Sequence, residues 1–392
     1  MRVYMDNAAT TRVIEPVFEA MKPYLCDIYG NPSSVHGFGR EALTALDRAR
    51  EQVAAALGAQ SSEIYFTGCG TESDNWAIRG AAYARRNKGN HIITTQIEHH
   101  AVLHTCQQLE KEGFEVTYLP VDEFGLVHPE ELEKALRPET TIVSIMYANN
   151  EIGTIEPIAE LCRIAKAHGA LFHTDAVQAV GHVPIDVKAL EVDMLSLSGH
   201  KLHAPKGVGA LYIRKGLHIQ RFMEGGAQER NQRAGTENVS SIVAMGAAIE
   251  LAVRHLNENV EKIAAMRDHL IGRILEEIPY ARLNGHPEKR LPGNVNVCFR
   301  FIEGEALLLS LDLMGIAGSS GSACTSGSLD PSHVLLAIGL PHEIAHGSLR
   351  LTLSEENTMG EVDYAVDSLK KIVERLRAMS PLYDEFLRTQ EG

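Results

Sequence analysis

The feature that most constrains the fold is a regular alternation of short apolar runs with helical periods over residues 39–174. Apolar residues recur every three or four positions over 39–57, and the segment ends at Gly58, which is typical of an amphipathic helix. Strands are then expected at 63–67, 91–95, 115–119, 141–147 and 170–174, and helices at 74–88, 99–112, 129–136 and 157–168. This alternation predicts a mainly parallel sheet with helices on both faces.

The length of 392 residues favours two domains over a single core. We expect a large α/β domain over 12–255, and a smaller α+β domain formed by 1–11 and 256–392. One long helix over about 240–275 is expected to link them. A strand at 294–299 and a helix at about 360–378 are expected in the smaller domain.

Composition narrows the class of protein. The formal net charge of −14 argues against non-specific binding to nucleic acid and against an acidic membrane surface. No apolar stretch is long enough to span a bilayer, and no signal peptide is evident. The cysteines lack C-x-x-C spacing, so we expect neither a disulfide framework nor a zinc site, and a cytoplasmic location. They are Cys26, Cys69, Cys106, Cys162, Cys298 and Cys324.

Lys201 is the first candidate for chemistry. The preceding run at 192–198 is typical of a buried strand, and Gly199 and Pro205 then break regular structure. A lysine at the end of a buried strand loses solvent, which lowers its pKa and frees the amine as a nucleophile. Such an amine forms a Schiff base with a carbonyl, and pyridoxal phosphate is the commonest carrier. The alternative for this residue alone is a surface-loop lysine.

Two further features fit an aldehyde cofactor. Asp175 stands where a parallel strand ends, the edge at which open α/β sheets bind ligands, and a carboxylate there would keep a pyridine nitrogen protonated. The turn at 68–73 joins a strand to a helix, and a helix N-terminus attracts a phosphate. Thr71 and Ser73 add hydroxyl groups. Each feature alone is ordinary, but the three in order predict a pyridoxal-phosphate site.

Several motifs resemble those of the cysteine desulfurases of the NifS/IscS group, within the fold-type-I pyridoxal-phosphate enzymes. They run nearly end to end and include YMDNAATT at 4–11, GNPSS at 30–34, TESDN at 71–75, EH at 98–99, NNEIG at 149–153, SGHK at 198–201, RAGT at 233–236 and SSGSACTS at 319–326. The last motif is the group's signature, and SufS-type enzymes have a shorter segment there. The resemblance implies a seven-stranded-type sheet in the large domain.

The resemblance also implies a reaction and its residues. L-cysteine would become L-alanine, with the sulfur held as a persulfide on Cys324, Lys201 moving the Cα proton and His99 serving as acid/base and ring-stacking partner. Substrate carboxylate binding is implied for Arg350 and Asn31, although Asn31 alone would also fit a simple turn. The other implied cofactor residues are Gly70, Thr71, Asn150, Asp175, Gln178, Ser198, His200 and Thr236. Thr236 would act from the neighbouring subunit, which requires a homodimer.

Cys324 lies in a run of Gly, Ser and Thr at 317–328 that cannot pack a core, so we expect an exposed, mobile loop carrying a nucleophilic thiol. Cys69, beside the expected phosphate site, is either a bystander or an alternative thiol. His99, His100 and His104 share helical spacing but lack a matching set of ligands, so no metal site is expected.

Three other functions remain open. A selenocysteine lyase or a general aminotransferase would share Lys201, Asp175 and the phosphate residues, but an aminotransferase has no use for Cys324. A non-enzymatic scaffold predicts the loss of these residues, and all are present. The resemblance further implies iron–sulfur cluster assembly or another sulfur-transfer pathway. It also implies that a sulfur-acceptor scaffold protein docks near Cys324. In such a complex Cys324 would also contact an iron–sulfur cluster.

Overall fold

A seven-stranded sheet lies at the centre of the larger part of the molecule, in a computed structural model that describes residues 1–320 and 331–390. Most of the loop expected at 317–328, including Cys324, lies outside the described residues. The strand order is β2-β8-β7-β6-β5-β3-β4. The strands are β2 (Ile64–Thr67), β3 (His91–Thr95), β4 (Glu115–Leu119), β5 (Thr140–Ser144), β6 (Leu171–Asp175), β7 (Met194–Ser198) and β8 (Gly209–Ile213). β8 pairs antiparallel with β2 and β7, and the other neighbouring strands pair in parallel, which confirms the mainly parallel sheet.

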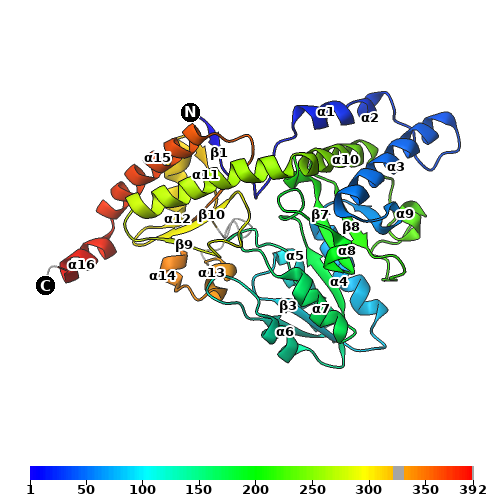
Figure 1. Cartoon of the computed structure of the whole chain (residues 1–392), viewed down its shortest axis with the longest axis horizontal. Coiled ribbons are helices and arrows are strands. Elements are labelled where there is room, and N and C mark those ends of the chain that lie inside the picture. The colour runs from blue at the N-terminus through cyan, green and yellow to red at the C-terminus, as the bar shows by residue number, and fades with distance from the viewer. Residues whose placement is uncertain (321–330, 391–392) are drawn as a thin grey trace.

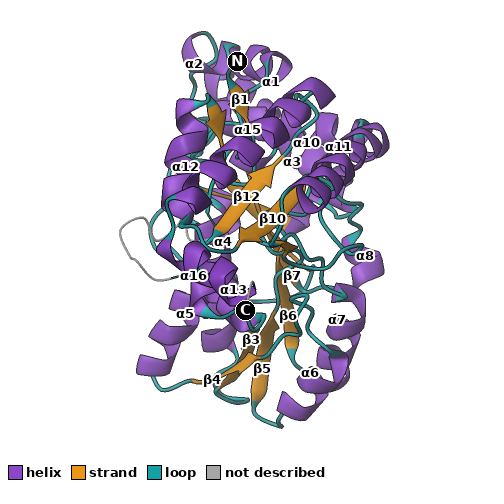
Figure 2. Ribbon diagram, turned by 90° about the vertical axis from the view of Figure 1, so that its left-hand side faces the viewer, coloured by secondary structure: helices purple, strands orange, loops and turns teal. Residues whose placement is uncertain are grey.

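Successive residues of the buried strands feed two different cores, because side chains alternate across a strand. Ile92 and Ile142 pack with α4 (Gly70–Ala84) and α5 (His100–Lys111) on one face. Ile93 and Val143 pack on the other face with α3 (Gly37–Leu57), α7 (Ile158–Ala167) and α10 (Val239–Arg254). Figure 2 shows α5 and α7 on opposite sides of this sheet. The predicted three-layer α/β architecture is confirmed.

The smaller part packs helices against an antiparallel sheet of order β12-β10-β9. Its strands are β9 (Ala281–Leu283), β10 (Asn294–Phe299) and β12 (Ser348–Thr352), and its main helices are α11 (Leu256–Glu277), α12 (Gly304–Leu313) and α15 (Met359–Ala378). The N-terminal β1 (Val3–Tyr4) pairs in parallel with β11 (Ile316–Ala317), and Val3 and Met5 join the core of this part. These contacts support the expected division into 12–255 and 1–11 with 256–392, which stays a prediction.

The prediction of a single helix over 240–275 is wrong. The chain forms two consecutive helices, α10 and α11 (Figure 1). Their axes differ by 72° at the break. The physical reason is that the two helices bury their apolar faces in different cores, Ile242 and Met245 in the larger part and Leu270 and Ile274 in the smaller. Within the described residues no single helix is long and apolar enough to cross a membrane, and α10 with α11 passes that test only as a bent pair.

The remaining helices are short and lie mainly at the surface. They are α1 (Glu15–Met21), α2 (Pro23–Cys26), α6 (Pro129–Ala135), α8 (Val187–Leu190), α9 (Gln228–Asn231), α13 (His333–Ala337), α14 (His342–Ala345) and α16 (Pro381–Gln390), with 3-10 turns at Ser61–Glu63 and Gly199–Lys201. The helix expected at 74–88 begins earlier, at Gly70, so Thr71 and Ser73 lie in its first turn.

Candidate active site

A cavity of about 310 Å³ lies at the carboxyl ends of the parallel strands. Asp175 ends β6 and Ser198 ends β7, and both line the cavity, as expected for an open α/β sheet. The structure brings most of the predicted residues together there. Those that line it are Gly70, Thr71, His99, Asn150, Asp175, Gln178, Ser198, His200, Lys201 and Arg350.

Lys201 ends the 3-10 turn that follows β7, and its side chain is partly buried. Its Nζ donates hydrogen bonds to the carbonyl oxygens of Ala8 and, at 2.7 Å, Ala9. Gln178 Nε2 also donates to the Ala8 oxygen, at 3.0 Å. The amine is therefore held inside the cavity by an N-terminal turn, which belongs to the YMDNAATT motif at 4–11.

Asp175 is the last residue of β6 and is buried. One carboxylate oxygen accepts the Val177 amide at 2.9 Å. Burial raises the pKa of Asp175 to about 6, although the Val177 amide and the nearby Lys201 charge oppose the shift. Asp74 of α4 lines the same cavity, and burial followed by the charge of Asp175 raises its pKa well above the ordinary value. Sequence reasoning missed Asp74, whose signal was its place in the TESDN motif.

His99 caps the N-terminus of α5, and its Nδ1 accepts the Ala101 amide at 3.1 Å. This contact assigns the ring proton to Nε2 in the neutral form. Burial, and then the charge of Lys201, lower the pKa of His99 to about 4. At neutral pH the buried ring is therefore uncharged and offers an N–H donor.

The phosphate end of the expected site is built from the start of α4 and the end of β7. A Cβ at Gly70 would lie 2.6 Å from Val177 Cγ2, so the close approach requires glycine. Among the described residues the buried Ser198 hydroxyl has no hydrogen-bond partner. His200 lines the same cavity, and burial lowers its pKa to about 4. A helix N-terminus beside an unpaired hydroxyl fits a phosphate monoester, so these residues fit pyridoxal phosphate.

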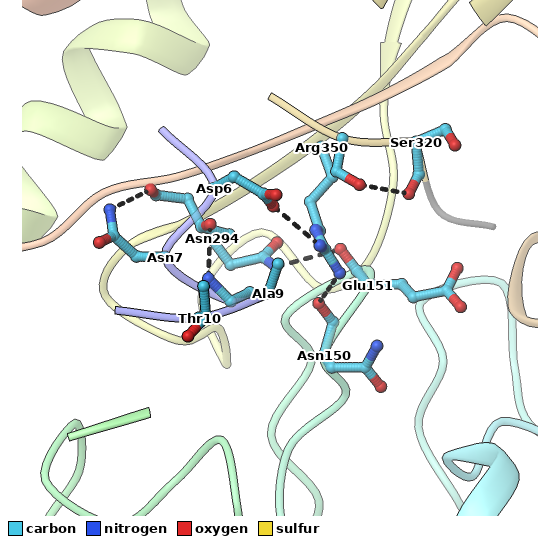
Figure 3. Close-up of polar contacts among 12 residues, drawn as sticks. Asp6, Asn7, Ala9, Thr10, Asn150, Glu151, Asn294, Ser320 and Arg350 are labelled. Atoms are coloured by element: carbon cyan, nitrogen blue, oxygen red, sulfur yellow. Dashed lines mark hydrogen bonds and ion pairs between the residues drawn. The ribbon is translucent and has the colours of Figure 1, made fainter. Parts of the chain in front are cut away.

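Arg350 lies on β12, is 3% exposed and lines the cavity. Its Nη1 donates to the carbonyl oxygen of Asn150 at 3.1 Å, and its Nη2 donates to Asp6 Oδ1 at 3.0 Å (Figure 3). A guanidinium has five N–H donors in a planar fork, so two contacts leave donors for a ligand carboxylate. Asp6 is a second residue of the site that sequence reasoning missed.

Two predicted residues lie away from the cavity of their own chain. Asn31 is exposed, and its Oδ1 accepts the Ser33 amide at 2.9 Å, which caps its own turn. Thr236 is exposed and lines a separate pocket of about 120 Å³ with Gly68 and Arg233. Cys324, the predicted nucleophile, lies outside the described residues.

Known proteins resemble this chain over almost its whole length. The pattern described as aminotransferase class-V matches residues 3–365. A cysteine desulfurase IscS from Methanosarcina thermophila is 58% identical over 99% of this chain and 96% of its own length. Another, from Dictyoglomus turgidum, is 55% identical over 98% of each chain.

Solved structures agree with the sequence relatives. A NifS-like protein is 43% identical, with a TM-score of 0.91 over 96% of this chain and 100% of that one. SspA, in a complex with cysteine, is 39% identical, with a TM-score of 0.81 over 91% of this chain and 100% of that one. These similarities extend across the segments that build the cavity, so the chain belongs to the aminotransferase class-V family and, within it, to the cysteine desulfurases.

Proposed function

We propose that this chain converts L-cysteine to L-alanine and retains the sulfur as a persulfide on Cys324. The observation that carries the proposal is the single cavity in which a lysine amine, a buried carboxylate and a buried guanidinium converge, from Lys201, Asp175 and Arg350. Enzymes of this family depend on pyridoxal phosphate, and the fit of the phosphate end supports the same cofactor here.

The residues that would hold the cofactor divide by the group they contact. Lys201 would bind its aldehyde carbon and Asp175 its ring nitrogen, while His99 would lie against the ring. Asn150 and Gln178 carry amides suited to the phenolic oxygen. The phosphate would lie against Gly70, Thr71, Ser198 and His200. Pyridoxal phosphate, when bound, supplies an electron sink that stabilises negative charge at the Cα of an amino acid.

The protein's own groups would then orient the substrate and move protons. The Arg350 guanidinium would bind the carboxylate of L-cysteine, and the Lys201 amine would take the Cα proton. His99, neutral and with its proton on Nε2, would donate a hydrogen bond or a proton from that atom. A negative charge at Asp175 would favour a protonated ring nitrogen, which its pKa of about 6 permits at neutral pH.

Sulfur transfer would use Cys324 in its thiolate form, because the thiol is a poor nucleophile. An S–S bond would form between the Cys324 sulfur and the substrate sulfur as the substrate C–S bond breaks and its electron pair stays with Cβ. Cβ would then take a proton, Cα would regain one from the Lys201 ammonium, and L-alanine would leave. Ser319, five residues before Cys324, exchanges backbone hydrogen bonds of 2.6 and 3.0 Å with Arg350. Five residues span at most about 17 Å, which supports access of the thiol to the cavity.

We also propose a homodimer. Thr236 and Asn31 lie away from the cavity of their own chain, so a partner would be needed to bring Thr236 to a phosphate. Large apolar side chains are exposed over the N-terminal region, with Val35 91% exposed, and a second copy would cover them. These side chains are Phe18, Leu25, Tyr29, Val35, Phe38 and Leu43.

The relatives named IscS support a proposal about the protein that accepts the sulfur. We propose a scaffold protein that docks near Cys324 and serves iron–sulfur cluster assembly. A cytoplasmic location fits this role, and the cysteines of the described residues, Cys26, Cys69, Cys106, Cys162 and Cys298, are all free thiols, as a reducing compartment requires.

The deciding experiment measures L-alanine formed from L-cysteine by the protein loaded with pyridoxal phosphate. The Cys324→Ala variant should form no alanine catalytically while still binding L-cysteine, as seen in the cofactor absorbance. Cys69→Ser is the matched control, because Cys69 is a thiol that lines the cavity, and it should retain activity. Full activity of Cys324→Ala would remove this thiol from the reaction. A protein that transaminates other amino acids but forms no alanine from L-cysteine would instead be an aminotransferase.

A further inference from the structure

The buried guanidinium of Arg350 is held from two sides. Asp6 Oδ1 accepts from Nη2 at 3.0 Å, and the Asn150 carbonyl oxygen accepts from Nη1 at 3.1 Å (Figure 3). The side chains of Arg350 and Asp6 are 4% and 20% exposed, so this ion pair is shielded from solvent. Within residues 1–320 and 331–390, Arg350 Nε is buried without a hydrogen-bond partner. That donor is available to a ligand that enters the cavity.

The backbone fixes Asp6 beside the strand that carries Arg350. Asp6 forms a parallel bridge with Thr352, two residues along β12. The Ala8 amide donates to Thr352 Oγ1 at 2.8 Å, and the Asp6 carbonyl oxygen accepts the Ala9 amide at 3.0 Å. The position of the Asp6 carboxylate therefore follows from a hydrogen-bonded turn rather than from a free surface side chain.

The same turn also holds the reactive lysine. The carbonyl oxygens of Ala8 and Ala9 accept hydrogen bonds from Lys201 Nζ, two and three residues after Asp6. One short segment thus contacts both the amine and the guanidinium, which line the same cavity. Its geometry sets where a substrate carboxylate would lie relative to the amine.

We propose that Asp6 is a positioning residue, which holds the Arg350 guanidinium in the orientation that binds the carboxylate of the amino-acid substrate. The inference rests on the proposed role of Arg350 and goes beyond it. Without Asp6, the hydrogen bond to the Asn150 carbonyl oxygen would be the one that still orients the Arg350 guanidinium among the described residues, and Nη2 would lose its acceptor. Loss of a hydrogen bond to a charged group corresponds to roughly tenfold or more in affinity.

The test separates binding of the carboxylate from binding of the rest of the substrate. The protein carries pyridoxal phosphate and the Cys324→Ala substitution, and cofactor absorbance reports the affinity for L-cysteine and for cysteamine, which lacks the carboxylate. Asp6→Ala should lower the affinity for L-cysteine about tenfold and change the affinity for cysteamine by less than about twofold. Asp6→Asn, which keeps an oxygen to accept from Nη2, should restore most of the affinity.

A double-substitution cycle completes the experiment. If Asp6 acts through Arg350, Asp6→Ala should cause no further loss of L-cysteine affinity in an Arg350→Ala background. One outcome would overturn this inference and leave the proposed role of Arg350 intact. In that outcome Arg350→Ala lowers the affinity for L-cysteine but not for cysteamine, and Asp6→Ala shows no such selective loss. Arg350→Ala that weakens both ligands equally would overturn both. An Asp6→Ala protein that loses cysteamine binding to the same degree has a general structural defect, which also contradicts a positioning role.

Discussion

Burial shifts the pKa values of ionisable side chains in the cavity in the direction that disfavours their charged forms. His99 is held neutral, with a pKa of about 4, and Asp175 has a pKa of about 6. Both shifts disfavour the charged form, as desolvation does. A bound cation at the ring nitrogen would favour ionised Asp175, so binding of the cofactor and ionisation of this carboxylate support each other.

Gly70 gives a test of the phosphate end at the scale of one residue. In Gly70→Ala the new Cβ would lie 2.6 Å from Val177 Cγ2 and 3.4 Å from Ser198 Cβ. Overpacking of this kind costs about 1–3 kcal/mol, so we expect affinity for pyridoxal phosphate to fall about tenfold or more. Equilibrium titration of the apoprotein with the cofactor, followed by absorbance, measures this change.

The matched control is Gly360→Ala on α15, where a Cβ would meet nothing within 4 Å. This substitution should leave cofactor affinity unchanged. Equal losses in both variants would mean that the effect at Gly70 reflects general instability rather than crowding of the phosphate end.

At the scale of elements, a buried carboxylate joins the connection before α6 to the segment that leads into α7. Glu156 Oε2 accepts the Val127 amide at 2.9 Å, and Oε1 is buried without a hydrogen-bond partner among the described residues. Burial raises the pKa of Glu156 to about 8, although the Val127 amide opposes the shift. The junction of these two segments therefore contains a carboxyl group that is protonated at neutral pH.

The raised pKa of Glu156 predicts a pH-dependent effect of Glu156→Gln. The pKa of Glu156 is higher in the folded protein than in the unfolded chain, so its protonation stabilises the fold at low pH. This stabilisation is lost as the pH rises from about 4.3 towards 8. Glutamine does not titrate, so the variant should gain up to about 2–3 kcal/mol relative to the parent between pH 6 and pH 8. Thermal unfolding of the apoprotein at the two pH values measures the difference. Glu374→Gln, at an exposed position, should show no such gain, and a gain of equal size at both positions would contradict the assignment.

At the scale of the whole molecule, the exposed Thr236 predicts a shared active site. Lys201→Ala and Thr236→Ala should each be inactive or nearly so when purified alone. If Thr236 acts on the cavity of a partner, mixing and reassociating the two variants creates one site with an intact Lys201 and an intact Thr236 from the other copy. Up to about a quarter of the parent activity should return, since half of the reassociated dimers are mixed and each has one intact site. Desulfurase assays before and after reassociation measure this, and no recovery in confirmed mixed dimers would place Thr236 in its own chain's site or outside the reaction.

The sequence alone determined the features that depend on neighbouring residues. Short apolar runs between helical periods located the strands of the seven-stranded sheet except β8, because these patterns repeat locally. They also placed Asp175 and Lys201 at strand ends where ligands bind. Glycine at position 70, next to a helix start, indicated the phosphate end. The family motifs supplied the reaction, which no local pattern could give.

Only the tertiary structure decided the features that depend on contacts between distant residues. Asp6 and Arg350 are 344 positions apart, so no local pattern could pair them. The break between α10 and α11 arises because two separate cores compete for one continuous helical pattern. The pKa shifts of His99 and Asp175 follow from burial, which is fixed only when the whole chain has folded around the cavity.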